Sequence, residues 1–187
     1  MKWQSISTSI DVVASPDQAY GLYTQLTRFP EWSPWLKSVE YDPDRASGST
    51  KWVLASRGVT VAWTAKQVAD EPGKRIAWEA TSGLPNKGEV TFRSLPGGSD
   101  GMAERGSSGS SSSNGEDGGT TEVKLEISYD APSFITVLVK NVSVLSRFIE
   151  KTLFKDLKRF KGVLEEELQE ERREEEANAA WERGEKW

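Results

Sequence analysis

The sequence predicts an α+β fold in which an antiparallel sheet of about seven strands curves around one long C-terminal helix. Apolar residues recur at steps of three and four between Ser143 and Glu171, so this helix has one apolar stripe that must be buried. Most of the chain before the helix alternates apolar and polar residues, which is typical of strands with one buried face. A sheet folded around the helix would bury both apolar surfaces.

The N-terminal part of the chain predicts one strand followed by two short helices. Residues Trp3 to Val13 alternate in polarity and form the first strand. Ser15, Pro16 and Gln18 then have the spacing of a capping box with proline in the first turn, so a helix begins there. The segment 27–36 contains two prolines and two tryptophans, which predicts a stiff aromatic connection with one helical turn.

Six more strands are expected, because each alternating segment is bounded by residues that favour turns. They span residues 37–41, 49–56, 59–69, 75–82, 89–95 and 120–129. An apolar segment from Phe134 to Val139 follows the last of them. We expect this segment to be a short helical or irregular piece that lies over one end of the sheet.

Two segments differ in composition from the rest of the chain. Residues 97–119 are almost entirely glycine, serine or charged, so we expect a flexible loop inside the domain. From Glu165 to Trp187 the chain has ten acidic and four basic residues, and like charges at helical spacing repel. We therefore expect one domain over residues 1–171, which contains that loop, and a frayed acidic tail over residues 172–187.

Composition excludes several kinds of site and partner. The chain has no cysteine, which excludes disulfides, thiol nucleophiles and thiolate metal sites. It has no histidine, which removes the commonest general base and metal ligand and any serine–histidine–aspartate triad. The net charge of −5 at pH 7 argues against a nucleic-acid partner. We expect no metal, no cofactor and a monomer.

No apolar run is long enough to span a bilayer, and the N-terminus lacks the apolar core of a signal peptide. These two features predict a soluble intracellular protein. Peripheral contact with a membrane stays open.

Three local patterns, together with the order of the elements, carry a family resemblance. They are Phe29-Pro30-x-Trp32-x-Pro34-x-Leu36-x-x-Val39, then Trp78 followed by Gly83-Leu84-Pro85-Asn86-x-Gly88-x-Val90-x-Phe92, and Asp156-Leu157-x-x-Phe160-Lys161. Over roughly residues 6–167 the chain resembles the helix-grip fold of the START-like (SRPBCC) superfamily. It is most similar to the polyketide cyclase/dehydrase and lipid-transport branch, which includes the coenzyme-Q-binding START-domain proteins.

The resemblance implies a deep, largely apolar cavity between the sheet and the long helix. Members of the family hold lipids, isoprenoid quinones, polyketides, sterols or plant hormones there, and some catalyse ring closure or dehydration. Similar proteins occur in algae, plants and cyanobacteria, so both the cytoplasm and the plastid stroma stay open as compartments. None of the three patterns is a catalytic signature.

The leading hypothesis is a carrier that binds and transports a hydrophobic small molecule, such as a lipid, isoprenoid, quinone or polyketide-like compound. One alternative is a cyclase or dehydratase that uses a carboxylate or a tyrosine for proton transfer. The other alternative is a protein-interaction module that uses the acidic tail or a basic stripe. The lack of histidine and cysteine favours the carrier.

Apolar residues on the inner faces of the strands and the long helix are the candidate cavity lining, because flat aromatic walls suit rings and polyprenyl tails. These candidates are Trp52, Leu54, Val61, Trp63, Ile76, Trp78, Val90, Phe92, Leu125, Ile127, Tyr129, Leu138, Leu145, Phe148 and Ile149. The candidates for the cavity entrance are Phe29, Trp32, Trp35, Leu84 and Pro85. The alternative is that the same side chains fill an ordinary core.

Charged residues within the strands are the candidates for acid–base chemistry, since burial beside a cavity would shift the pKa of such a group. They are Asp11, Lys66, Arg75, Glu79 and Arg93, with Tyr129 as a hydroxyl donor. The alternation of the strands turns most of them towards solvent, which argues against a catalytic role.

A basic stripe is predicted on the long helix. It consists of Arg147, Lys151, Lys155 and Lys158 or Arg159, which follow one another at helical spacing. Such a stripe suits anionic lipid headgroups or an acidic partner. It is also compatible with a solvated helix face that has no partner.

Overall fold

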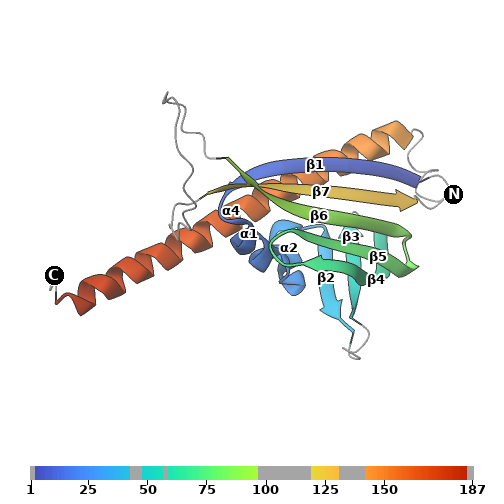
Figure 1. The fold of residues 1–187 in the computed structure, drawn as a ribbon. Helices are drawn as coiled ribbons and strands as arrows, with labels where there is room; N and C mark the ends of the chain where they lie inside the picture. The colour runs from blue at the N-terminus through green and yellow to red at the C-terminus, as the bar shows by residue number, and fades with distance from the viewer. Residues whose placement is uncertain (1–2, 43–47, 57–58, 97–118, 131–141, 185–187) are drawn as a thin grey trace, which may run out of the picture.

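The computed structural model describes residues 3–42, 48–56, 59–96, 119–130 and 142–184. In it, seven antiparallel strands form one curled sheet with a long helix packed against it (Figure 1). The elements are β1 (Trp3–Val13), α1 (Pro16–Tyr23), η1 (Leu26–Arg28), α2 (Phe29–Trp32), β2 (Leu36–Tyr41), β3 (Ser49–Ser56), β4 (Val59–Glu71), β5 (Arg75–Gly83), β6 (Asn86–Leu95), β7 (Thr120–Asp130) and α4 (Val142–Glu182). The predicted α+β class, with its curved sheet, two short helices and long C-terminal helix, is confirmed.

The order of the strands across the sheet is β1-β7-β6-β5-β4-β3-β2. From β2 to β7 the strands follow one another in sequence order, and β1 lies at the far edge beside β7. The β1–β7 pairing runs without a break from Trp3 opposite Asp130 to Val13 opposite Thr120. The first and last strands are therefore neighbours, and α4, which comes after β7, packs chiefly against β1 and α2.

The predicted capping box is present at the start of α1. The backbone N–H of Gln18 donates to Ser15 Oγ at 3.2 Å, and the backbone N–H of Ser15 donates to Gln18 Oε1 at 2.8 Å. Because both free donors are satisfied, the chain turns sharply from β1 into α1. This turn brings Tyr20 and Tyr23 to the inner face of the sheet.

The apolar stripe of α4 forms the centre of the core at one end of the sheet. Its buried members are Leu153, Leu157, Phe160, Leu164 and Leu168. The Phe160 ring is fully buried and makes edge contacts with Tyr23 and Trp32, at centroid distances of 5.5 and 5.4 Å. This cluster fixes α1 and α2 against α4.

Two element boundaries lie three or more residues from the expected ones. The long helix does not end near Glu171 but continues to Glu182, past the edge of the sheet (Figure 1). Glutamate, arginine and alanine favour helix, and each like-charge pair costs only a few tenths of a kcal/mol, so repulsion does not end the helix. Residues beyond Leu168 are almost all exposed, with Trp181 83% exposed. Fraying of this stretch in solution stays a prediction.

The second difference is the connection between β5 and β6, which is shorter than the expected turn over residues 83–88. The strands extend to Gly83 and resume at Asn86. Gly83 has φ +80°, and a β-carbon there would lie 2.2 Å from the carbonyl oxygen of Ala62. Only glycine permits this close turn.

Some expectations concern residues outside the described part of the chain. One is the expected flexible loop over residues 97–119, of which only Gly119 is described. The other is the expected short segment Phe134–Val139, which lies wholly outside. Among the described helices, none combines the length and apolar character needed to cross a membrane.

Candidate functional site

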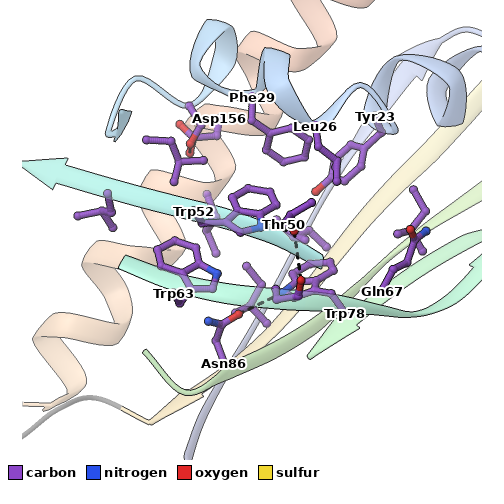
Figure 2. A pocket seen from close by; sticks show the side chains of 18 of the residues that line it. Tyr23, Leu26, Phe29, Thr50, Trp52, Trp63, Gln67, Trp78, Asn86 and Asp156 are labelled. Atoms are coloured by element: carbon purple, nitrogen blue, oxygen red, sulfur yellow. Dashed lines mark hydrogen bonds between the residues drawn. The ribbon is translucent and has the colours of Figure 1, made fainter. Parts of the chain in front are cut away.

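A cavity of about 930 Å³ lies between α1 and α2, the inner face of the sheet, and the first half of α4 (Figure 2). It is present because α4 packs on β1 and α2, which leaves space over β3, β4 and β5. Small-molecule sites in proteins usually measure about 300–1,000 Å³. This cavity therefore has room for a ligand with several rings or a long tail.

Two tryptophans on paired strands form one wall of the cavity. Trp52 on β3 lies opposite Trp63 on β4, and their indoles stack with centroids 5.9 Å apart and planes inclined by 10°. The ring of Phe29, from α2, meets Trp52 edge-on at 5.2 Å. The result is a cluster of three aromatic rings contributed by three elements (Figure 2).

Two of the tryptophans that line the cavity have their indole N–H groups satisfied within the protein. Trp52 Nε1 donates to Thr50 Oγ1 at 2.8 Å, and Trp78 Nε1 donates to Asn86 Oδ1 at 3.2 Å. Asn86 in turn donates from Nδ2 to the carbonyl oxygen of Leu84 at 2.8 Å. Because these indole N–H groups already have acceptors, Trp52 and Trp78 offer the cavity mainly their apolar faces.

Gly88 on β6 provides the space in which the Trp78 ring lies. A β-carbon at residue 88 would fall 2.6 Å from Trp78 Cζ2 and 2.5 Å from the carbonyl oxygen of Glu126. A side chain there would therefore displace the indole. The absence of a side chain at Gly88 therefore allows the Trp78 ring to form part of the cavity wall.

Asp156 on α4 is a buried carboxylate on the cavity wall. It is 6% exposed, and Ser33 Oγ donates to its Oδ2 atom at 2.7 Å. Trp35 Nε1 donates to the same oxygen, and Arg159 donates to Oδ1 at 3.1 Å. Burial raises the pKa of Asp156, and the three donors oppose that rise by stabilising the carboxylate.

A second polar contact lies between α1 and β4. Tyr20 Oη donates to Asp70 Oδ1 at 2.5 Å, and both residues line the cavity. This hydrogen bond, with burial and the charge of Asp70, raises the pKa of Tyr20 to about 12. The hydroxyls of Tyr129 and Ser146 lie 3.3 Å apart and join β7 to α4.

The charged residues that line the described part of the cavity are all acidic. They are Asp42, Asp70 and Asp156, and no described lysine or arginine lines it. Arg159 contacts Asp156 from outside the lining and has a side chain that is 47% exposed. Within the described residues, no group of three or more carboxylates is placed to hold a metal ion.

Most of the residues predicted to line a cavity lie around this one. Those in the lining are Trp52, Leu54, Val61, Trp63, Ile76, Trp78, Leu125, Ile127, Tyr129, Phe148 and Ile149, and from the predicted entrance Phe29, Trp32, Trp35 and Leu84. Leu138 lies outside the described residues, as does the side chain of Leu145.

Val90, Phe92 and Pro85 are not in the lining. Val90 is fully buried, and Phe92 packs edge-on against Tyr20 and Tyr23 at centroid distances of 5.9 and 5.8 Å. Strand alternation identified the correct face of β6, but α1 covers this part of that face. Pro85 lies in the β5–β6 turn, where its carbonyl oxygen accepts from the backbone N–H of Asp130 at 3.0 Å.

The charged strand residues proposed for acid–base chemistry are not brought into the cavity. Asp11, Lys66 and Glu79 are exposed. Arg75 and Arg93 form ion pairs with acidic neighbours on the sheet surface, at 3.0 Å to Glu89 and 2.9 Å to Glu122 respectively. Of that set, only Tyr129 lines the cavity.

Asp156 is the polar cavity residue that sequence reasoning missed, together with Ser33, Tyr20 and Asp70. Strand alternation says nothing about Asp156, because this residue lies on the long helix. A signal was available, because Asp156 comes three residues after Leu153 and four before Phe160, which places it on the buried stripe.

Comparison with known proteins agrees with this architecture. The family model for polyketide cyclase/dehydrase and lipid transport matches residues 12–161. A crystal structure from Deinococcus radiodurans shares 28% identity with a TM-score of 0.57, covering 84% of this chain and 95% of that one. No curated protein matches this chain.

Two more distant structures are similar in fold. A START superfamily protein from Mycobacterium smegmatis has 13% identity and a TM-score of 0.62, covering 87% of this chain and 97% of that one. The Zhui aromatase/cyclase from Streptomyces sp. R1128 has 15% identity and a TM-score of 0.63, covering 89% and 96%. With the family match over most of its length, the chain belongs to the polyketide cyclase/dehydrase and lipid-transport family.

Proposed function

We propose that this protein binds an uncharged, largely apolar small molecule in the cavity beneath α4. A lipid, an isoprenoid, a quinone or a polyketide-like compound has the required character. The stacked pair of Trp52 and Trp63 carries this proposal, because it offers apolar faces to an interior of about 930 Å³. Packed cores do not contain voids of this size.

The charges of the lining support an uncharged ligand. A carboxylate or phosphate group inside the cavity would lie near Asp70 and Asp156 and would meet no lysine or arginine among the described lining residues. Burying an anion without a counter-ion costs several kcal/mol. A hydroxyl group avoids this cost, because it can donate to the Asp156 carboxylate, whose oxygens can each accept more than one hydrogen bond.

We propose first that the protein carries its ligand without changing it chemically. The Asp156 carboxylate already accepts hydrogen bonds from Ser33, Trp35 and Arg159, and these hold it in place. A polar group held in this way can fix the orientation of a bound ligand without reacting with it.

An enzyme is the second candidate, and one observation favours it. Asp156 is a buried carboxylate on the cavity wall whose pKa is raised by burial, and such a group exchanges protons nearer to neutral pH than an exposed aspartate does. Ring closure and dehydration both require a proton acceptor or donor beside the substrate. Asp156 would be that group.

The test has two parts. Native mass spectrometry of the purified protein should first reveal a co-purified apolar compound, and quenching of tryptophan fluorescence should follow its re-addition. The bound compound is then incubated with wild-type protein and with Asp156→Asn, and its mass is followed over time. An unchanged mass supports the carrier. Conversion that Asp156→Asn abolishes would replace the carrier with the enzyme, and absence of any apolar binding would reject both.

A further inference from the structure

One exposed face of α4 combines basic and aromatic side chains. Arg147, Lys151, Lys155 and Lys158 follow at steps of four, four and three, so they form one stripe, and all four are exposed. Two phenylalanines belong to the same surface, with Phe148 63% and Phe154 39% exposed. Lys158 Nζ lies 5.2 Å from the centre of the Phe154 ring. We call these six residues the basic face.

The charge of the basic face is not neutralised by the described parts of the protein. Arg147, Lys151 and Lys155 form no ion pair with any described residue, in contrast to Arg159 and Lys161. Glu150 is the one exposed acidic residue between Arg147 and Lys161, a stretch that the structure describes in full. The sequence over residues 131–141, just before α4, has no acidic residue and contains one lysine.

The two halves of α4 carry opposite charge. Residues 147–161 contain six basic and two acidic residues, and residues 164–182 contain nine acidic and two basic ones. The acidic half runs beyond the sheet, whereas the basic half lies over the cavity (Figure 1). A negatively charged surface would therefore attract one end of the helix and repel the other, which gives the molecule a defined orientation.

We propose that the basic face docks on an anionic lipid bilayer. A bilayer is favoured because long basic side chains interleaved with phenylalanines suit the boundary between headgroups and acyl chains, where the rings enter and the charges stay at the phosphates. Phe148 is exposed and also lines the cavity, so docking brings the cavity wall to the membrane surface. Docking requires no ligand, so this proposal stands independently of the proposed function.

Vesicle flotation tests the proposal directly. The full chain is mixed with vesicles of phosphatidylcholine alone, or with roughly one third phosphatidylserine, at about 0.1 M and about 0.5 M NaCl. Wild type should float with the anionic vesicles at low salt and should be released at high salt. It should not float with the neutral vesicles under either condition.

Matched charge reversals locate the binding surface. Lys151→Glu with Lys155→Glu should weaken binding to anionic vesicles at least about tenfold. Lys51→Glu with Lys66→Glu, on exposed positions of β3 and β4, changes the net charge equally and should reduce binding less than about threefold. Phe154→Ser, which removes an aromatic ring and keeps the charge, should also weaken binding. Circular dichroism confirms that each variant is folded.

Any one of several outcomes would overturn the proposal. One is failure of the wild-type protein to bind anionic vesicles. Another is an equal loss of vesicle binding in the two double lysine variants, and a third is unchanged binding in Lys151→Glu with Lys155→Glu. Capture by immobilised polyglutamate without binding to vesicles would also overturn it, and would assign the basic face to an acidic protein partner.

Discussion

Ser33 Oγ donates a hydrogen bond of 2.7 Å to Asp156 Oδ2 and so ties the end of α2 to the middle of α4 across 123 positions of sequence. Both residues are buried, with 4% and 6% exposure. The pair sets the distance between two walls of the cavity. It also places a titrating group in an apolar interior, which makes the stability of the fold sensitive to pH.

The pH dependence of unfolding should report Asp156. Burial raises the pKa of this carboxyl in the folded state, so the folded protein keeps the proton to higher pH than the unfolded chain does. The contribution of Asp156 to stability therefore falls as the pH rises through the raised pKa. Urea unfolding from about pH 4 to pH 7 should show Asp156→Asn gaining stability relative to wild type as the pH increases. Unfolding free energies of Asp156→Asn that run parallel to those of wild type across this pH range would contradict the prediction.

Removing the hydroxyl of Ser33 should make the free energy of unfolding depend more strongly on pH. In Ser33→Ala the Asp156 carboxylate loses one of its three hydrogen-bond donors. We therefore expect the free energy of unfolding to fall by about 1–3 kcal/mol at neutral pH. The loss should shrink at low pH, where the carboxyl is protonated. A loss that is constant across the pH range would show that Ser33 acts through packing alone.

The two glycines at 88 and 162 should respond to alanine in opposite directions. A β-carbon at residue 88 meets Trp78 and the backbone of β7, so Gly88→Ala should destabilise the fold by about 1–3 kcal/mol and change tryptophan fluorescence. Gly162 lies exposed in α4, and a β-carbon there would have no neighbour within 4 Å, so Gly162→Ala should stabilise by up to about 1 kcal/mol. Equal effects in thermal unfolding would contradict the assignment of Gly88 as the support of the Trp78 ring.

Removing an aromatic ring should cost less unfolding free energy in a cavity wall than in a packed core. Phe160 is fully buried and outside the lining, so Phe160→Ala should cost about 3–5 kcal/mol in unfolding free energy. Trp63 is only partly buried and faces the cavity, so Trp63→Ala should cost less. The two variants should rank in the opposite order when affinity for an apolar ligand is measured. Trp63→Ala should lose affinity, whereas the folded fraction of Phe160→Ala should retain it. A larger stability loss for Trp63→Ala would show that Trp63 belongs to the packed core.

Hydrogen exchange should divide α4 into two parts. Backbone amides around Leu153 to Leu168 lie on a buried stripe and should exchange slowly, through global unfolding. Those between Arg173 and Glu182 lack apolar packing and should exchange within seconds to minutes. Strong protection at Ala179 and Ala180 in the isolated protein would contradict this.

Local patterns were sufficient for the elements and their faces. Ser15 and Gln18 specify the start of α1 by themselves, since both hydrogen bonds of the capping box form within four residues. The stripe from Leu153 to Leu168 specifies the buried face of α4, because helical spacing is a property of the chain alone.

The rest of the site depends on contacts between distant segments. Periodicity places Phe92 on the inner face of β6, but only the packing of α1 decides that its ring meets Tyr20 and not a ligand. Asp156 acquires its role from Ser33 and Trp35, which lie more than a hundred residues earlier. Such juxtapositions have no signature in a single sequence.

The pairing of β1 with β7 has a consequence for synthesis on the ribosome. β1 is made first, but the strand that covers its edge begins more than a hundred residues later, and the helix that covers its inner face comes later still. Until then the nascent chain presents an unpaired strand edge, the kind of surface at which chains associate wrongly. The sheet can be completed only after β7 has emerged from the exit tunnel, so the last steps of its assembly depend on long-range contacts.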